Sequence, residues 1–227
     1  MCNVSGISFG TKNLVSMEIT GKKVIEVGSY DVNGSLRSFI ESLDPAEYIG
    51  VDIEEGPGVD IVCNAEDIVE IFGEESFDVV ISTELMEHVK EWRRVISNLK
   101  KVCKNDGIII LTTRSYGFPY HGYPHDYWRF ELDDIKNVFS DFDIISLEND
   151  YLEPGIFLKA RKPTNFTENN LSAYKLYNIV KNKRSTNIDD KDLKSLYFKR
   201  LVFKESLNNF LLKIRGYLYY KLFSKND

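Results

Sequence analysis

The sequence has few of the residues that hold small extracellular or zinc-bound domains together. Its 227 residues include three cysteines, Cys2, Cys63 and Cys103, and no two of them form a Cys-x-x-Cys pair. The odd number argues against a disulfide framework, and the spacing argues against a structural zinc site. We therefore expect a reduced, cytoplasmic protein in which Cys63 and Cys103 are buried and inert.

Long apolar runs are also missing. The longest, such as Ile108–Leu111, are far too short to cross a bilayer, and the first residues lack the apolar stretch of a signal peptide. The chain is nevertheless 43% hydrophobic. A chain of this length and composition can bury one sizeable core and has some length left over.

Charge is divided unevenly along the chain. Residues 1–160 hold 14 Lys and Arg against 29 Asp and Glu, a balance of −15, whereas residues 161–227 hold 15 against 6, a balance of +9. The acidic part argues against nucleic acid as its ligand, and we expect no nucleic-acid partner. The division itself indicates a separate basic extension.

Glycine and acidic residues follow the first two apolar runs of the acidic part. Val24–Val27 contains Glu26 and leads into Gly28, and about two dozen residues later a second run ends at Asp52. Glycine lets the backbone approach a ligand, and a carboxylate after the second strand can accept both ribose hydroxyls. This order predicts a nucleotide-type cofactor at one edge of a parallel sheet.

The hydrophobic periodicity predicts alternating strands and helices, followed by two strands without a helix between them. We therefore predict an α/β fold, with a seven-stranded mostly parallel sheet, helices on both faces and a terminal antiparallel hairpin. We place this domain at residues 1–162 and a basic helical extension at 163–227. The expected strands are 23–27, 48–53, 59–62, 77–82, 108–112, 142–147 and 155–160, and the expected helices are 36–43, 66–72, 89–102 and 131–139.

Four stretches carry a family resemblance: Val24–Gly28, Gly50–Ile53, Phe77–Val89 and Asp106–Ile110. Together they make residues 20–161 resemble the class I S-adenosylmethionine-dependent methyltransferases, in particular the type 11 small-molecule group. Glu87-His88-Val89 is the most specific part. The resemblance places Glu87 and His88 at the start of the next helix, where we interpret His88 as a structural hydrogen bonder rather than a base.

The resemblance implies S-adenosylmethionine as the cofactor, but the turn departs from the family pattern. Tyr30 and Val32 replace later glycines of the usual Glu-x-Gly-x-Gly-x-Gly, and Asn64 stands where many relatives carry Asp. Relatives that share the Ser-x-x-x-Asn-Gly-Ser form argue for a working turn. Ile53 could pack in the core instead of against the adenine. Asn64 could cap a helix instead of binding the adenine. The expected cofactor-binding residues are Glu26, Gly28, Ser29, Gly34, Asp52, Ile53, Asn64, Ala65 and Thr83.

The segment Tyr120–Phe130 contains two histidines, an aspartate, an arginine and several aromatic residues, which is more than a connecting loop needs. It follows the strand edge where ligands bind in open α/β sheets. Methyl transfer to an O–H or N–H acceptor requires close positioning and removal of a proton. His121 is our first candidate for the catalytic base, and Asp126 is the second candidate or its orienting partner.

The same segment offers walls for the acceptor. We expect Tyr127, Trp128 and Arg129 to bind substrate, with Arg129 pairing with an anionic group. The alternative is that Trp128 and Phe130 anchor the core while Asp126 and Arg129 form a structural pair. We expect no metal, because the spacing of His121, His125 and Asp126 fits no common ligand pattern.

The leading function is methyl transfer to a small-molecule acceptor. A sugar or glycan intermediate is the acceptor suggested by relatives with the Asp-Tyr-Trp-Arg-Phe segment, which often accompany surface-polysaccharide genes. The alternatives are a catalytically silent cofactor-binding scaffold and, third, a nicotinamide-dependent oxidoreductase. The Glu-His-Val segment and the terminal hairpin argue against the oxidoreductase.

The sequence of the basic tail does not decide what the tail binds. It carries helical apolar spacing, and we narrowly favour docking on its own domain or on a sister subunit, which would make a homodimer. Peripheral contact with an anionic membrane is the alternative, since basic helices with an apolar side lie well in interfaces.

Overall fold

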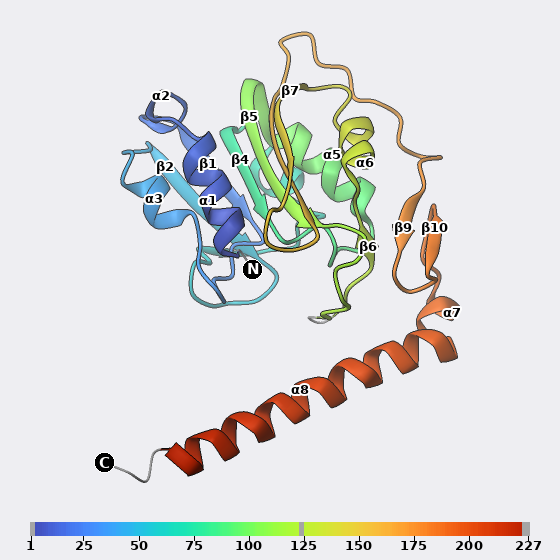
Figure 1. Ribbon diagram of the computed structural model, residues 1–227. Helices are drawn as coiled ribbons and strands as arrows, with labels where there is room; N and C mark the ends of the chain where they lie inside the picture. The colour runs from blue at the N-terminus through green and yellow to red at the C-terminus, as the bar shows by residue number, and fades with distance from the viewer. Residues whose placement is uncertain (1–2, 123–124, 224–227) are drawn as a thin grey trace.

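A central sheet lies between two layers of helices in the computed structural model, which describes residues 3–122 and 125–223 (Figure 1). Its strand order is β3-β2-β1-β4-β5-β8-β7, with β1 to β5 parallel and β8 antiparallel to both neighbours. This confirms the predicted seven-stranded fold and its terminal hairpin. The strands are β1 (Lys23–Val27), β2 (Glu47–Asp52), β3 (Ile61–Val62), β4 (Phe77–Thr83), β5 (Cys103–Arg114), β7 (Asp143–Asn149) and β8 (Gly155–Arg161).

The two faces of the sheet have separate apolar clusters, because side chains alternate between faces along each strand. Ile25 and Val27 of β1 pack with the helices on one side, whereas Val24 packs with those on the other. The first side carries α4 (Ile68–Phe72), α5 (Trp92–Val102) and α6 (Leu132–Val138), and the second carries α1 (Val4–Asn13), α2 (Ser16–Ile19) and α3 (Arg37–Glu41).

A small second sheet was not expected from the sequence. It has the order β10-β9-β6 and joins the segment after β5 to the chain beyond residue 170. Its strands hold two or three residues each, too few for a periodicity to be visible. They are β6 (Trp128–Arg129), β9 (Leu176–Asn178) and β10 (Lys183–Ser185).

The compact part of the molecule continues past the boundary that we placed at residue 162. Leu176, Val180 and Phe198 are buried in the larger apolar cluster. The guanidinium of Arg93 on α5 donates hydrogen bonds to the backbone carbonyls of Leu171 and Tyr174. The first 40 or so residues of the expected extension are therefore packed as part of the domain.

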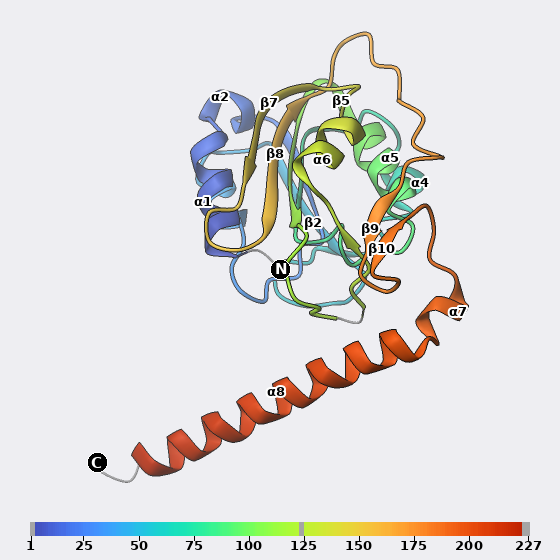
Figure 2. The same cartoon turned by 45° about the vertical axis from the view of Figure 1, so that its right-hand side comes forward.

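The chain ends in a long helix that leaves the domain. After α7 (Asp190–Leu193), α8 (Leu196–Phe223) begins against the core through Phe198. Both views show the rest of it running below the domain and clear of it (Figures 1 and 2). The side chain of Phe203 is already 69% exposed. On its own domain, the tail therefore packs through β9, β10 and the first turns of α8. Docking on a sister subunit stays a prediction. Among the helices of the described residues, none combines the length and apolar composition that crossing a membrane requires.

Candidate active site

A cavity opens at the carboxyl ends of the parallel strands, between β3, β2, β1 and β4. Each strand supplies part of the wall from the residues at or just after its end. Five of the predicted cofactor-binding residues lie in this wall. They are Gly28, Asp52, Ile53, Asn64 and Ala65.

Gly28 is a position where the fold requires glycine. Its φ is +85°, and a Cβ there would lie 3.0 Å from the Cβ of Leu85. A side chain would therefore strain the backbone and crowd the turn after β4. The open backbone at Gly28 is what a cofactor needs for close approach. Tyr30 and Val32, which replace the usual glycines, line the same cavity.

Asp52 ends β2 at the rim of the cavity. Its Oδ2 accepts a hydrogen bond from the Tyr30 backbone N–H at 3.1 Å, which orients the carboxylate. Carboxylate oxygens have about four lone-pair sites, so free acceptor capacity remains. The neighbouring Ile53 is 55% exposed and lines the cavity instead of the core. This pair of a carboxylate and an apolar side chain suits a ribose and an adenine face.

Asn64 and Ala65 are held in place from behind. The Asn64 side-chain oxygen accepts the Glu66 backbone N–H at 2.9 Å, a local cap of the kind we gave as the alternative. The Asn98 amide on α5 donates to the carbonyls of Ala65 and Glu66 at 3.1 and 2.7 Å. Asn98 was not among the residues predicted from the sequence. Its signal was a polar residue within the apolar stripe of a helix.

Four predicted cofactor residues do not line the cavity. Thr83 is buried at the end of β4, and the Ser29 hydroxyl is buried without a hydrogen-bond partner among the described residues. Glu26 is buried on the opposite face of β1, where its carboxylate accepts hydrogen bonds from Tyr48 and Ser35. Glu26 therefore holds the loop that ends near Gly34, and its direct contact with a cofactor stays a prediction.

His121 and Asp126 are brought together, as expected for a base and its orienting partner. His121 Nδ1 lies 2.9 Å from Asp126 Oδ2, and the His121 backbone N–H donates to the same oxygen at 3.0 Å. Burial lowers the pKa of His121, but Asp126 and Glu87 outweigh it and raise the pKa to about 9. At neutral pH His121 would therefore act as a base only through its minor neutral form.

Arg129 is occupied within the protein. It is 1% exposed, and its guanidinium donates to both oxygens of Asp126 and to the backbone carbonyls of Phe118 and Pro119. This arrangement corresponds to the alternative in which Asp126 and Arg129 form a structural pair. Trp128 is likewise buried, with its Nε1–H donating to the Lys90 carbonyl at 3.2 Å. Of the three residues expected to bind substrate, only Tyr127 lines the cavity.

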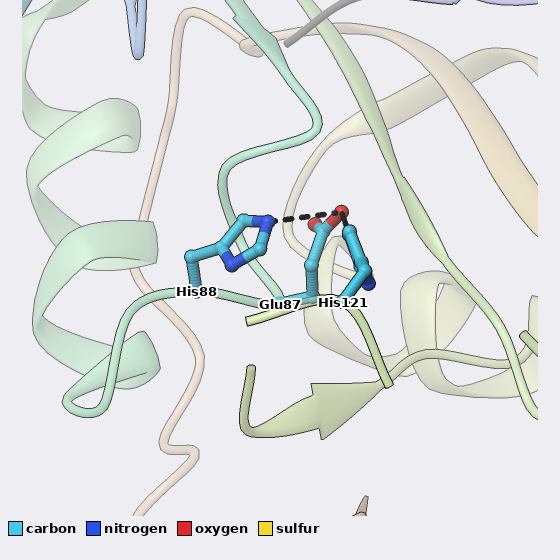
Figure 3. Close-up of side chains that lie close together, drawn as sticks. All are labelled: Glu87, His88 and His121. Atoms are coloured by element: carbon cyan, nitrogen blue, oxygen red, sulfur yellow. Dashed lines mark ion pairs between the residues drawn. The ribbon is translucent and has the colours of Figure 1, made fainter. Parts of the chain in front are cut away.

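His88 lies between the cavity and the pair formed by His121 and Asp126. It lines the cavity, and its ring centroid lies 4.8 Å from that of His121. Burial lowers the pKa of His88, with Glu87 opposing, so the ring is neutral at neutral pH. Figure 3 shows both imidazoles directed at the carboxylate of Glu87. The structure thus groups Glu87, His88 and His121, although 33 residues separate His88 from His121 in the chain.

Glu84 is a buried acidic group in the cavity wall, just after β4. It has a φ of +53° and forms an ion pair with Arg114, while the Thr112 hydroxyl donates to its Oε1 at 2.8 Å. Burial and the charge of Glu87 raise the pKa of Glu84 to about 8, against the pull of Arg114. A strained, partly protonated carboxyl at a ligand cavity is typical of functional sites.

Residues 30–111 match the family described as a methyltransferase domain. The chain is 28% identical over 122 residues to phthiotriol/phenolphthiotriol dimycocerosates methyltransferase 1 of Mycobacterium ulcerans, a match that covers 48% of this chain. It spans 44% of the length of that relative, which is less than half. The chain is therefore similar, over part of its sequence and in its fold, to S-adenosylmethionine-dependent methyltransferases.

Solved structures show the same methyltransferase fold at low sequence identity. The 1,6-didemethyltoxoflavin-N1-methyltransferase of Burkholderia thailandensis, with bound S-adenosylhomocysteine, is 13% identical with a TM-score of 0.57, covering 70% of this chain and 78% of that one. The [4+2]-cyclase SpnF is 15% identical with a TM-score of 0.54, covering 70% and 81%. The fold alone therefore does not fix the reaction.

Proposed function

We propose that this chain binds S-adenosylmethionine in the cavity and transfers its methyl group to a small-molecule acceptor. The observation that carries the proposal is that Gly28 and Asp52 meet at one cavity, and that Asp52 lies in the stretch that matches the methyltransferase domain family. The open backbone at Gly28 suits the amino-acid end of the cofactor, and the oriented carboxylate of Asp52 suits the ribose hydroxyls. The donor set therefore fits the cofactor.

When bound, the cofactor supplies an electrophilic methyl group on a sulfonium. The protein has to hold the acceptor in line with that group and remove a proton from it. We propose that His121 and Asp126 serve the proton transfer, with Asp126 fixing the imidazole through Nδ1. Tyr127 and His88 form the cavity wall beside the acceptor.

The acceptor class that we propose is a sugar or glycan intermediate. The family resemblance of the Asp126–Phe130 segment supports it. The cavity wall is largely apolar, but Glu84 and His88 are polar groups in it that suit hydroxyl groups. Incubation of the full-length chain with methyl-labelled S-adenosylmethionine and a panel of sugars and nucleotide-linked sugars would test it. If no sugar becomes labelled while another small molecule does, the acceptor is not a sugar and belongs to the class of that molecule.

Titration calorimetry with S-adenosylhomocysteine, and separately with NAD, tests the cofactor. Asp52→Ala should weaken S-adenosylhomocysteine binding by about 1.5–3 kcal/mol for each charge-assisted hydrogen bond that is lost. Asp60→Ala is the matched control on the chain segment that follows β2, because Asp60 pairs with Arg37 and does not line the cavity. Equal affinity in wild type and Asp52→Ala would refute the assignment. Tight cofactor binding without transfer to any acceptor would favour the silent scaffold.

We further propose that α8 contacts an anionic membrane surface from the cytoplasmic side. Phe203, Leu207, Phe210 and Ile214 are all exposed and recur at helical spacing on one side of α8. Basic residues, Lys204, Lys213 and Arg215, flank this stripe. Exposed leucines also lie outside this stripe, among them Leu211 and Leu212, so the basic residues supply the preference for an anionic surface.

Sedimentation with phosphatidylserine vesicles tests this contact. The full-length chain should sediment with the vesicles, and the binding should weaken as salt shortens the range of the attraction. A chain ending at Glu205 should stay in the supernatant. Loss of a dimer in that shorter chain, with no vesicle binding by either chain, would instead show that the stripe pairs two copies.

A further inference from the structure

Three side chains beside the cofactor cavity direct their donor atoms at one point. They are Glu87 and His88 in the turn after β4, and His121 in the segment after β5 (Figure 3). One donor atom from each residue lies within 4.8 Å of the others. The closest approaches to Glu87 Oε1 are 3.7 Å from His121 Nε2 and 4.0 Å from His88 Nε2.

These distances are too long for hydrogen bonds. They are close to the separation of two ligands that share one metal ion. With Zn–N and Zn–O bonds of about 2.0–2.1 Å, neighbouring ligands of a tetrahedral site lie about 3.4 Å apart. The longest of these separations, which is within 4.8 Å, would have to shorten to about 3.4 Å around an ion. Small rotations of the two imidazoles and the carboxylate give such a movement.

The other nitrogen of each imidazole is already fixed. His88 Nδ1 lies 2.7 Å from the backbone carbonyl oxygen of His125, and His121 Nδ1 lies 2.9 Å from Asp126 Oδ2. An imidazole that donates Nδ1–H to an oxygen presents a lone pair at Nε2. A hydrogen bond from the remote nitrogen to a carbonyl or a carboxylate is the usual outer shell of a histidine that binds metal.

Two atoms of the cluster have no hydrogen-bond partner among the described residues. Glu87 Oε1 and His88 Nε2 are both buried, and the exposed fractions of their side chains are 0% and 10%. The second carboxylate oxygen of Glu87 accepts the Thr113 hydroxyl at 2.9 Å. Unpartnered buried acceptors are costly and rare, and a cation would satisfy both.

We propose that Glu87, His88 and His121 bind a divalent zinc-type metal ion. Two imidazoles and a carboxylate are a donor set of catalytic zinc sites, in which a fourth position stays open. The ion would displace the proton from Nε2 of His121 when it binds. His121 is 28% exposed, so the fourth position faces accessible space. His88 is shared between this site and the cavity wall.

The site also bears on the acceptor, and this part rests on the proposed function. With the ion bound, His121 Nε2 is a ligand and no longer takes the proton. The ion would instead hold an acceptor oxygen beside the methyl group and favour loss of its proton to water. It therefore favours acceptors that present a hydroxyl or carboxyl oxygen.

The three histidines of the chain provide a matched set of variants. The untagged full-length protein, stripped with a chelator, is titrated with zinc chloride by calorimetry. Cobalt chloride is used in parallel, because its visible absorption reports the ligands directly. Wild type and His125→Ala should bind one ion per chain. His88→Ala and His121→Ala should lose at least ~100-fold in affinity, and Asp126→Asn should lose about 10–100-fold through the outer shell.

The outcomes separate this proposal from the proposed function. Asp52→Ala should bind zinc as wild type does, even though it binds S-adenosylhomocysteine poorly. Glu87→Gln keeps the shape of the side chain, and thermal unfolding of this variant checks that the fold is retained. The proposal is overturned if wild type binds no ion at about 100 μM zinc, or if His88→Ala and His121→Ala bind as tightly as His125→Ala does.

Discussion

The guanidinium of Arg129 holds the carboxylate of Asp126 in a two-pronged contact, Nη1 to Oδ1 at 2.5 Å and Nη2 to Oδ2 at 2.6 Å. The same carboxylate orients His121 through Nδ1. Burial raises the pKa of Asp126, but the hydrogen bonds and charges of Arg129 and His121 outweigh it and hold the pKa below its ordinary value. The stability of the fold and the geometry of the candidate base therefore depend on one ion pair.

Arg129→Met should destabilise the protein by about 3–5 kcal/mol, because it leaves the Asp126 carboxylate buried without its cation. Urea unfolding at neutral pH measures the loss. The double variant Asp126→Asn with Arg129→Met should recover part of it, since no unpaired charge is then buried. A double variant that is as unstable as the sum of the two single variants would show that the two residues do not interact.

His121→Ala and Asp126→Asn should lower the rate of methyl transfer more than they weaken cofactor binding. A positioned proton acceptor contributes about 10²–10⁴-fold to the rate. Turnover on the true acceptor and calorimetry with S-adenosylhomocysteine separate the two effects. His125→Ala is the control, because only its backbone carbonyl takes part in the cluster. Near-normal rates in both variants would mean that this segment is structural.

The sequence was sufficient to predict the large sheet, because its strands are long or strongly apolar. Val79–Ile81 and Ile108–Leu111 are buried runs of the kind that parallel sheets require. The second sheet was not predictable, because β6, β9 and β10 are two or three residues long. Their pairing depends on Asn178 meeting Trp128 across 50 residues of chain. Nothing local encodes that contact.

The candidate site likewise has residues that could be placed from the sequence and residues that could not. Gly28 and Asp52 could be placed from the sequence, because the ends of adjacent parallel strands must meet at one edge. The pairing of Asp126 with Arg129 was one of two alternatives that the spacing left open. The meeting of His88 with His121 was not predictable, because it depends on the path of the irregular segment after β5.

Glu26→Gln tests the pH dependence of stability. Burial raises the pKa of Glu26 above its ordinary value of 4.5, although Tyr48 and Ser35 donate hydrogen bonds to the carboxylate. The stability linked to a raised pKa is fully present below pH 4.5 and is lost as the pH rises through the raised value. Wild type should therefore lose stability relative to Glu26→Gln over that interval.

Denaturant unfolding of both proteins between about pH 4.5 and 8 measures this difference. The introduced glutamine keeps the size of the side chain and one acceptor for Tyr48, so the comparison isolates the charge. Parallel pH profiles of the two proteins would show that Glu26 does not titrate differently in the folded and unfolded states.

Two shortened chains locate the end of the folded unit. A chain ending at Lys162 removes Leu176, Val180 and Phe198, which are buried in the main core. Burying one such side chain stabilises by about 1.5–3 kcal/mol, and the sum approaches a total stability of about 5–15 kcal/mol. This chain should lose its cooperative thermal transition.

A chain ending at Glu205 removes only the exposed part of α8 among the described residues, so its free energy of unfolding should change by no more than about 0.5 kcal/mol. A folded, stable chain ending at Lys162 would show that β9, β10 and the start of α8 pack on the domain without stabilising it.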